Sequence, residues 1–164
     1  MGHDMAMPPE LVRRGRRAVY VPGAKASEPM VPSIEGEWAR KRRMMSRVWR
    51  ILRISRITRL QEYAPLYAMM LVSHRLLRYA SPFLHVVAFG TNLGLARRGG
   101  RLERATLAFQ IAVLAAAAAG DRVRARPFLI ARYYVATTAA IGFGLYDHLR
   151  HGTPEGWEPA EGTR

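Results

Sequence analysis

The residues best suited to chemistry are basic and lie close together in the first half of the chain. Arg40, Lys41, Arg42 and Arg43 form one cluster, and further arginines follow at a spacing of three, at positions 47, 50, 53, 56 and 59. Guanidinium groups bind phosphate through paired hydrogen bonds, so nucleotides, lipid head groups and nucleic acids are the partners that this segment suggests. The alternative is that the run is a solvated or lipid-facing charged surface.

The spacing of three does not match the α-helical repeat. A helix advances about 100° per residue, so each step of three falls about 60° short of a full turn and the arginines wind around the helix. We therefore expect no clean amphipathic stripe from these five arginines. The apolar residues between them favour a position near an anionic surface, with anionic lipid as a partner.

The histidines offer weaker chemistry. His74 and His85 have no carboxylates beside them, and we expect no metal site there. His148 and His151 lie three residues apart next to Asp147, which suits a metal ligand set, but Gly152 follows at once and favours a surface cluster. The chain has no cysteine, which excludes thiol catalysis and zinc-thiolate sites. It also has no nucleotide-binding glycine motif, serine nucleophile elbow or zincin motif.

Composition favours a membrane protein. The 164 residues are 49% hydrophobic and carry a formal net charge of +14, and the apolar and charged residues are segregated along the chain. Three apolar stretches, at about residues 81–96, 105–120 and 127–146, are bounded by basic residues. Each is near the lower length limit for crossing a hydrocarbon core of about 30 Å. They predict three transmembrane helices within residues 80–147, and a soluble helical bundle is the alternative. Arg132 lies inside the third stretch, where a charged side chain is costly in lipid. The simpler explanation is that its side chain snorkels to the membrane interface, and the other is that it pairs with another residue.

The rest of the chain predicts shorter elements. Residues 46–79 indicate basic and interfacial helices, with Pro65 in a first turn. Residues 10–17 suggest a short helix that ends at Gly15, and residues 18–21 suggest a β-strand. We expect a loop at residues 24–35 and a polar, irregular tail at residues 148–164. The N-terminus does not read as a signal peptide, and the basic run before the apolar stretches favours a cytoplasmic location for residues 1–60.

Four segments in order along the chain carry a family resemblance. Residues 2–28 contain an acidic position at Asp4, a glycine that ends a helix, and the run Val19-Tyr20-Val21-Pro22. The Arg-rich segment 37–43, the segment 73–83 and the terminal residues 157–164 follow. Together they resemble the late catalytic region and membrane block of membrane-bound family 2 glycosyltransferases of the cellulose- and hyaluronan-synthase type. Two positions depart from the family pattern: His3 stands where Glu or Asp is usual, and Met44 stands where the better-known synthases have Trp.

The resemblance implies a fold and a function. The fold is mainly α, with interfacial helices and three transmembrane helices, preceded by a small remnant of an α/β, GT-A-like catalytic domain in residues 1–45. The chain would be the C-terminal membrane portion of a glycosyltransferase in bacterial polysaccharide biosynthesis, in the inner membrane and inactive alone. The nucleotide-sugar donor would bind through a missing domain, which would also supply the ligands of a divalent cation, Mg or Mn.

The resemblance also implies site residues. Asp4 would be the catalytic base that takes the proton of the acceptor hydroxyl. Arg40, Lys41 and Arg43 would bind the diphosphate of the donor. Without the resemblance, Asp4 is more simply a helix N-cap.

Two other classes of function remain beside the glycosyltransferase. The first is a non-enzymatic small membrane protein whose basic segment binds lipid or a partner. The second is a nucleic-acid-binding protein, which fits the charge but not the three apolar stretches, so we expect no nucleic acid as a partner.

Overall fold

The computed structural model describes residues 3–27, 31 and 33–153. Helices account for 78% of the described residues, which contain no strand, and this confirms the mainly α class. The chain divides into two compact units. The first unit consists of Met1–Leu77 with Phe143–Arg164, and the second of Arg78–Gly142.

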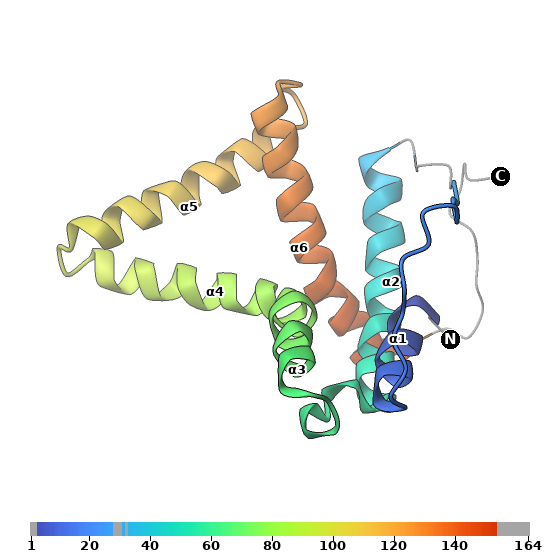
Figure 1. Cartoon of the computed structure of the whole chain (residues 1–164). Helices are drawn as coiled ribbons and strands as arrows, with labels where there is room; N and C mark the ends of the chain where they lie inside the picture. The colour runs from blue at the N-terminus through green and yellow to red at the C-terminus, as the bar shows by residue number, and fades with distance from the viewer. Residues whose placement is uncertain (1–2, 28–30, 32, 154–164) are drawn as a thin grey trace. The chain divides into compact units, whose positions relative to one another are not determined.

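The first unit begins with α1 (His3–Arg13) and α2 (Ile34–Ile54) (Figure 1). Gly15 ends α1 with a φ of 70°, a left-handed conformation that glycine adopts without a steric penalty. The N–H of Arg16 then bonds back to the carbonyl of Leu11 at 2.9 Å. This confirms the predicted helix end at Gly15, whereas the helix begins at His3 and not at residue 10. At the start of α2, the Ser33 hydroxyl accepts the N–H of Gly36 at 3.0 Å, an N-cap.

The chain leaves α2 at Ser55 through two short 3-10 turns, η1 (Arg56–Thr58) and η2 (Leu60–Glu62). The helix α3 (Pro65–Leu71) follows, with Pro65 in its first turn as predicted, and continues into a π-helical turn, η3 (Val72–Leu76). Because α2 ends at Ile54, Arg56 and Arg59 lie outside it. The five arginines therefore do not share one helix, and only Arg47, Arg50 and Arg53 lie on α2.

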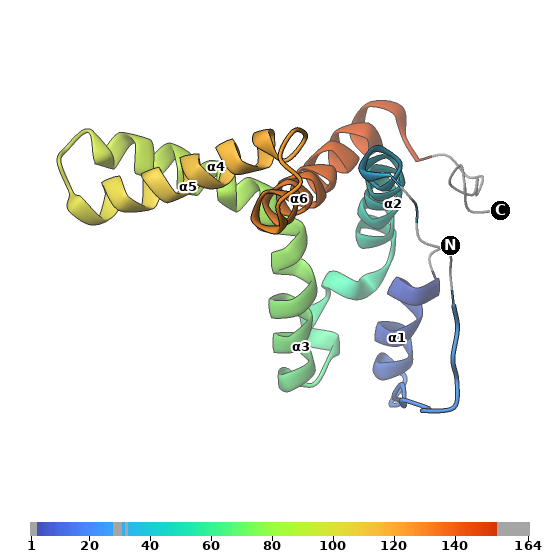
Figure 2. The same ribbon diagram turned by 90° about the horizontal axis from the view of Figure 1, so that it is seen from above.

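A small apolar core holds these elements together. Its buried residues are Ile57, Tyr63 and Leu71, and the partly buried side chains around it come from α1, α2, η2 and α3: Met5, Val12, Ile51, Leu52, Leu60, Tyr67 and Ala68. In Figure 2, η1 and η2 lie between α1 and α3. This core places α1 against the C-terminal end of α2.

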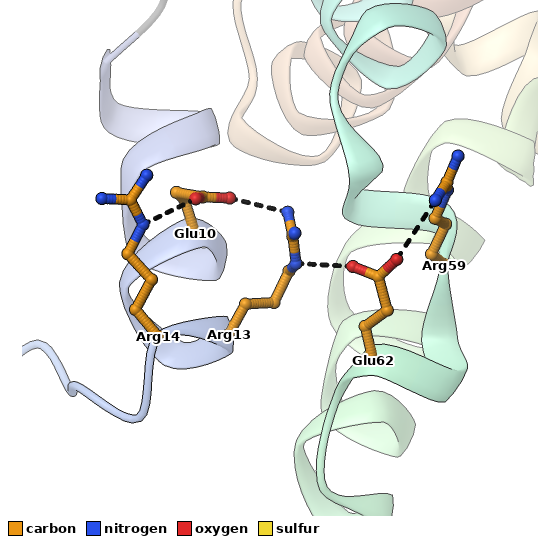
Figure 3. Close-up of polar contacts among 5 residues, drawn as sticks. All are labelled: Glu10, Arg13, Arg14, Arg59 and Glu62. Atoms are coloured by element: carbon orange, nitrogen blue, oxygen red, sulfur yellow. Dashed lines mark hydrogen bonds and ion pairs between the residues drawn. The ribbon is translucent and has the colours of Figure 1, made fainter.

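An ion-pair network reinforces this contact between α1 and η2 (Figure 3). Arg13 reaches Glu10 at 2.7 Å on its own helix and Glu62 at 2.6 Å across to η2. Glu62 also meets Arg59 at 3.3 Å, and Arg14 meets Glu10 at 2.8 Å. The side chain of Arg13 is only 18% exposed, so its two ion pairs are screened less than surface pairs.

The second unit is built from α4 (Leu77–Ala96, from Arg78 on), α5 (Arg101–Ala119) and the part of α6 (Arg126–His151) that ends at Gly142. These helices coincide with the three apolar stretches predicted from the sequence. Gly99, with a φ of 97°, supplies the left-handed residue in the turn between α4 and α5.

Two of the three helices are long and apolar enough to cross a membrane, α5 and α6. Their apolar windows are only 6% and 17% buried, whereas the core helix of a soluble protein is mostly buried. The helix α4, which carries Arg78 and His85, does not meet this criterion. The structure thus supports two of the three predicted spans.

Three expectations about shorter segments are corrected. Residues 18–21 follow an irregular path with no strand pairing, and Val19 and Tyr20 are 71% and 85% exposed. The strand of the GT-A-like remnant is therefore not formed, because the described chain offers it no neighbouring strand. Helix α2 already begins at Ile34, inside the expected loop of residues 24–35. Helix α6 extends to His151, so the first residues of the predicted tail are helical, and residues 154–164 lie outside the described part.

Candidate functional site

The predicted base, Asp4, lies in the first turn of α1. Its side chain is outside what the structure describes. The next residue is tied down, since Nη1 of Arg75 donates to the carbonyl of Met5 at 3.0 Å. Arg75 belongs to η3, so the resemblance segments around residues 4 and 75 are joined directly. The start of α1 is thus fixed both by this hydrogen bond and by the core contact of Met5.

The predicted diphosphate-binding residues lie on α2 around a shared carboxylate. Arg40 holds Glu37 with two hydrogen bonds, at 2.7 and 2.9 Å, and Lys41 approaches the same carboxylate at 3.3 Å. The hydrogen bond from Arg40 is the main cause that lowers the pKa of the Glu37 carboxyl below its ordinary value of 4.5. Arg43 is partly buried on the same helix. A bound diphosphate would have to compete with Glu37 for Arg40 and Lys41.

The packing of α1 against α2 lies away from this basic cluster. The core that includes Met5 of α1 meets α2 at Ile51 and Leu52. Arg43 and Arg40 lie about two to three turns back toward the start of α2. Both segments belong to the first unit.

Arg42, the remaining member of the cluster, has a different partner. Its Nε and Nη2 atoms form a two-point ion pair with Asp147 of α6 at 2.5 and 2.6 Å. Its guanidinium carbon also lies 5.5 Å from the centre of the Phe143 ring, and Trp38 packs edge-on against that ring at 5.6 Å. Arg42 therefore fixes α2 to the C-terminal end of α6 and is not available as a phosphate ligand.

Two further contacts support this junction between α2 and α6. A Cβ added at Gly144 would lie 2.5 Å from the Cβ of Met45 and 2.9 Å from the N atom of Ser46. The Thr153 hydroxyl donates to the carbonyl of Ser46 at 3.2 Å. The backbones of the two helices thus approach closely at a glycine.

Sequence analysis missed the partnership of Arg42 and Asp147, which are 105 residues apart. A signal was present, because Asp147 is the only acidic residue between Arg122 and Pro154. A lone carboxylate in an apolar helix is expected to pair with a cation. The neighbouring His148 bonds through Nδ1 to the Thr153 hydroxyl at 2.8 Å. Among the described residues, no group of three His, Asp or Glu side chains could hold a metal ion.

The polar side chains of the second unit pair between helices. Nε2 of His85 in α4 lies 2.6 Å from the Tyr134 hydroxyl in α6, and its Nδ1 lies 2.6 Å from the carbonyl of Ser81. A carbonyl only accepts, so Nδ1 carries the proton and, in the neutral ring, Nε2 accepts from Tyr134. Asn92 in α4 donates to Gln110 in α5 at 3.0 Å.

Arg132 is paired as well. Its Nη1 meets Asp121 at 2.6 Å and the carbonyl of Gly120 at 3.4 Å, at the turn between α5 and α6. Of the two accounts of Arg132 that the sequence left open, the structure thus shows pairing.

No family model, curated protein or solved structure matches this chain.

Proposed function

We propose that this chain is the membrane portion of a family 2 glycosyltransferase that transfers a sugar from a nucleotide-sugar donor to a saccharide or lipid acceptor. The observation that carries the proposal is the arrangement of residues 3–27 in the first unit. A helix with Asp4 in its first turn is fixed to the segment before α4, and an exposed, β-prone run follows it. A segment that belongs to a larger catalytic domain is expected to leave such apolar residues uncovered.

Asp4 is assigned the chemistry of the acceptor. In an inverting transfer, the carboxylate takes the proton from the acceptor hydroxyl while that oxygen attacks the anomeric carbon of the sugar. The bond between the anomeric carbon and the leaving diphosphate breaks in the same step. Its position at the start of α1 gives Asp4 a fixed backbone, which a general base needs.

Arg40, Lys41 and Arg43 are assigned to the leaving diphosphate, whose negative charge they would stabilise. Glu37 holds two of the three in place before a donor binds. The divalent cation of the family would depend on ligands elsewhere, since the described residues do not form a cluster that fits one. No step assigned to this chain depends on it.

The second unit is proposed to anchor the enzyme through three spans, α4, α5 and α6. The polar residues that lower the apolar character of α4 have partners on the other two helices: His85 with Tyr134 and Asn92 with Gln110. A polar side chain that is satisfied by a neighbouring helix is much cheaper to place in lipid than an unsatisfied one. The membrane location follows from this anchor, and a bacterial inner membrane with residues 1–60 in the cytoplasm is the setting that we propose.

The test is a turnover assay on the full product of the gene, with any in-frame sequence that precedes Met1, in membranes or detergent. Release of nucleoside diphosphate from a panel of nucleotide sugars is measured. Asp4→Asn is expected to lower turnover by about 10² to 10⁴, the usual contribution of a general base. Asp121→Asn removes a carboxylate from the turn between α5 and α6 and is the control. An unchanged rate in Asp4→Asn, or no donor turnover with any nucleotide sugar, would overturn the assignment.

A further inference from the structure

The turn between α4 and α5 gathers arginines in a short length of chain (Figure 1). Helix α4 ends at Ala96 and α5 begins at Arg101. The N–H of Gly99 bonds back to the carbonyl of Ala96 at 3.3 Å, so the connection is tight. We call the basic residues of this connection the arginine turn, and its members are Arg97, Arg98, Arg101 and Arg104.

Only one of these arginines is bound to the protein itself. Arg104 folds back over the turn, where its Nε donates to the carbonyl of Ala96 at 3.4 Å. Its Nη2 would lie 3.6 Å from a Cβ added at Gly99. The other three members are exposed, and within the described part of the chain their guanidinium groups form no ion pair or hydrogen bond. Three cations of the arginine turn are therefore open to an external anion.

A single carboxylate lies at this turn and does not balance its charge. Glu103 is the only acidic residue between Glu62 and Asp121. Its side chain lies over the start of α5, where a Cβ added at Gly100 would collide with its Oε2 atom. Four arginines against one glutamate leave the turn with a net charge of +3. Helix stability does not account for this charge, because cations in the first turn of a helix face the positive end of its dipole.

Exposed apolar side chains reach the arginine turn along both helices. Leu93 and Leu95, near the end of α4, are 42% and 38% exposed, and Leu102, in the first turn of α5, is 73% exposed. Helix α5 is one of the two helices apolar enough to cross a membrane. Where such a helix ends, its apolar side chains meet acyl chains and its cations meet head groups. A nucleic acid would match the charge but would leave these leucines uncovered.

We infer that the arginine turn binds the phosphate head groups of anionic phospholipids, with Leu95 and Leu102 against the acyl chains. Guanidinium groups suit this role because they bind phosphate through paired hydrogen bonds. This surface goes beyond glycosyl transfer and rests only on the proposed membrane location of the second unit. The titration below and the transfer assay measure different properties, so if lipid binding fails while donor turnover persists, only this inference is lost.

The test places a fluorescent label beside the arginine turn. The chain has no cysteine, so Ala105→Cys, at an exposed position next to Arg104, provides a single labelling site. The labelled full chain in a zwitterionic detergent is titrated with a short-chain phosphatidylglycerol and, separately, with the matching phosphatidylcholine. We expect a saturable response to phosphatidylglycerol that weakens with added salt, and no comparable response to phosphatidylcholine.

The variant Arg98→Gln with Arg101→Gln tests the turn itself, at two exposed positions where glutamine disturbs no packing. Its affinity for phosphatidylglycerol is expected to fall about 30-fold, which corresponds to about 1 kcal/mol for each arginine. The control, Arg122→Gln with Arg124→Gln, removes the same charge from exposed positions beyond the other end of α5. The two ends of α5 are about 28 Å apart at 1.5 Å per residue, so the control should change the affinity less than about threefold.

Three results would overturn the inference. The first is equal binding of the two lipids. The second is an equal loss of affinity in the turn variant and in the control, which would show a general attraction between net charges. The third is tighter binding of a short oligonucleotide than of phosphatidylglycerol at the same salt concentration, which would assign the arginine turn to another class of partner.

Discussion

The ion pair between Arg42 and Asp147 should be measurable as a coupling free energy between α2 and α6. Both guanidinium contacts are short, at 2.5 and 2.6 Å, and the pair is bidentate. Hydrogen bonds to charged groups contribute about 1.5 to 3 kcal/mol when they are shielded, and exposed ion pairs only about 0.2 to 1 kcal/mol. Arg42 is 38% exposed and Asp147 22% exposed, so solvent screening reduces the larger figure. We expect a coupling of about 1 to 2 kcal/mol.

The assay is a double-mutant cycle on the free energy of unfolding in mixed micelles. The cycle compares Arg42→Gln, Asp147→Asn and the double variant with the unchanged chain. The pair of Glu10 and Arg14, whose side chains are 41% and 73% exposed, is the matched control and should couple by less than about 0.5 kcal/mol. A coupling between Arg42 and Asp147 no larger than that of the control would refute the reasoning that this pair fixes α2 to α6.

Three further predictions concern other contacts. Gly144→Ala should destabilise the fold by about 1 to 3 kcal/mol, because the added Cβ would collide with α2. The control Gly94→Ala has open space around its Cβ and should be neutral or stabilising, and equal unfolding free energies of the two variants would contradict the close approach of α6 to α2 at Gly144. Tyr134→Phe should cost about 0.6 kcal/mol by losing the hydrogen bond to His85, and an unchanged unfolding curve would remove that bond from the account. Because the pKa of Glu37 is lowered, its contribution to stability is present above its ordinary pKa of 4.5 and is lost as the pH falls through the pKa of the folded state. In that pH range the free energy of unfolding should therefore decline more steeply in the unchanged chain than in Glu37→Gln. Parallel pH profiles of the two proteins would argue against this role of Glu37.

The sequence predicts the helices correctly where neighbouring residues mark their ends or form an apolar run. Gly15 and Pro65 mark a helix end and a helix start, and both are confirmed. The three apolar stretches are confirmed as helices because apolar runs bounded by charges leave few alternatives. The strand expected at residues 18–21 failed for a different reason. Its β propensity is local, but a strand also needs a partner that the described chain does not supply.

The site was recoverable only in part. The sequence predicts that residues 40–43 act together, whereas the structure separates Arg42, which pairs with α6, from Arg40 and Lys41, which share Glu37. Which arginine faces which neighbour depends on contacts between residues about a hundred positions apart, and no local pattern encodes them.

The proposed function places the second unit in a membrane, and cysteine accessibility tests that location most directly. The chain has no native cysteine, so single cysteines can be placed at will. Val86 in α4, Ile111 in α5 and Val19 in the first unit are 72%, 51% and 71% exposed. In open or inverted membranes, cysteines at positions 86 and 111 should resist a polar maleimide until detergent is added, while one at position 19 reacts at once. Equal labelling at all three positions before detergent would show that the apolar helices face water, and the membrane account would be wrong.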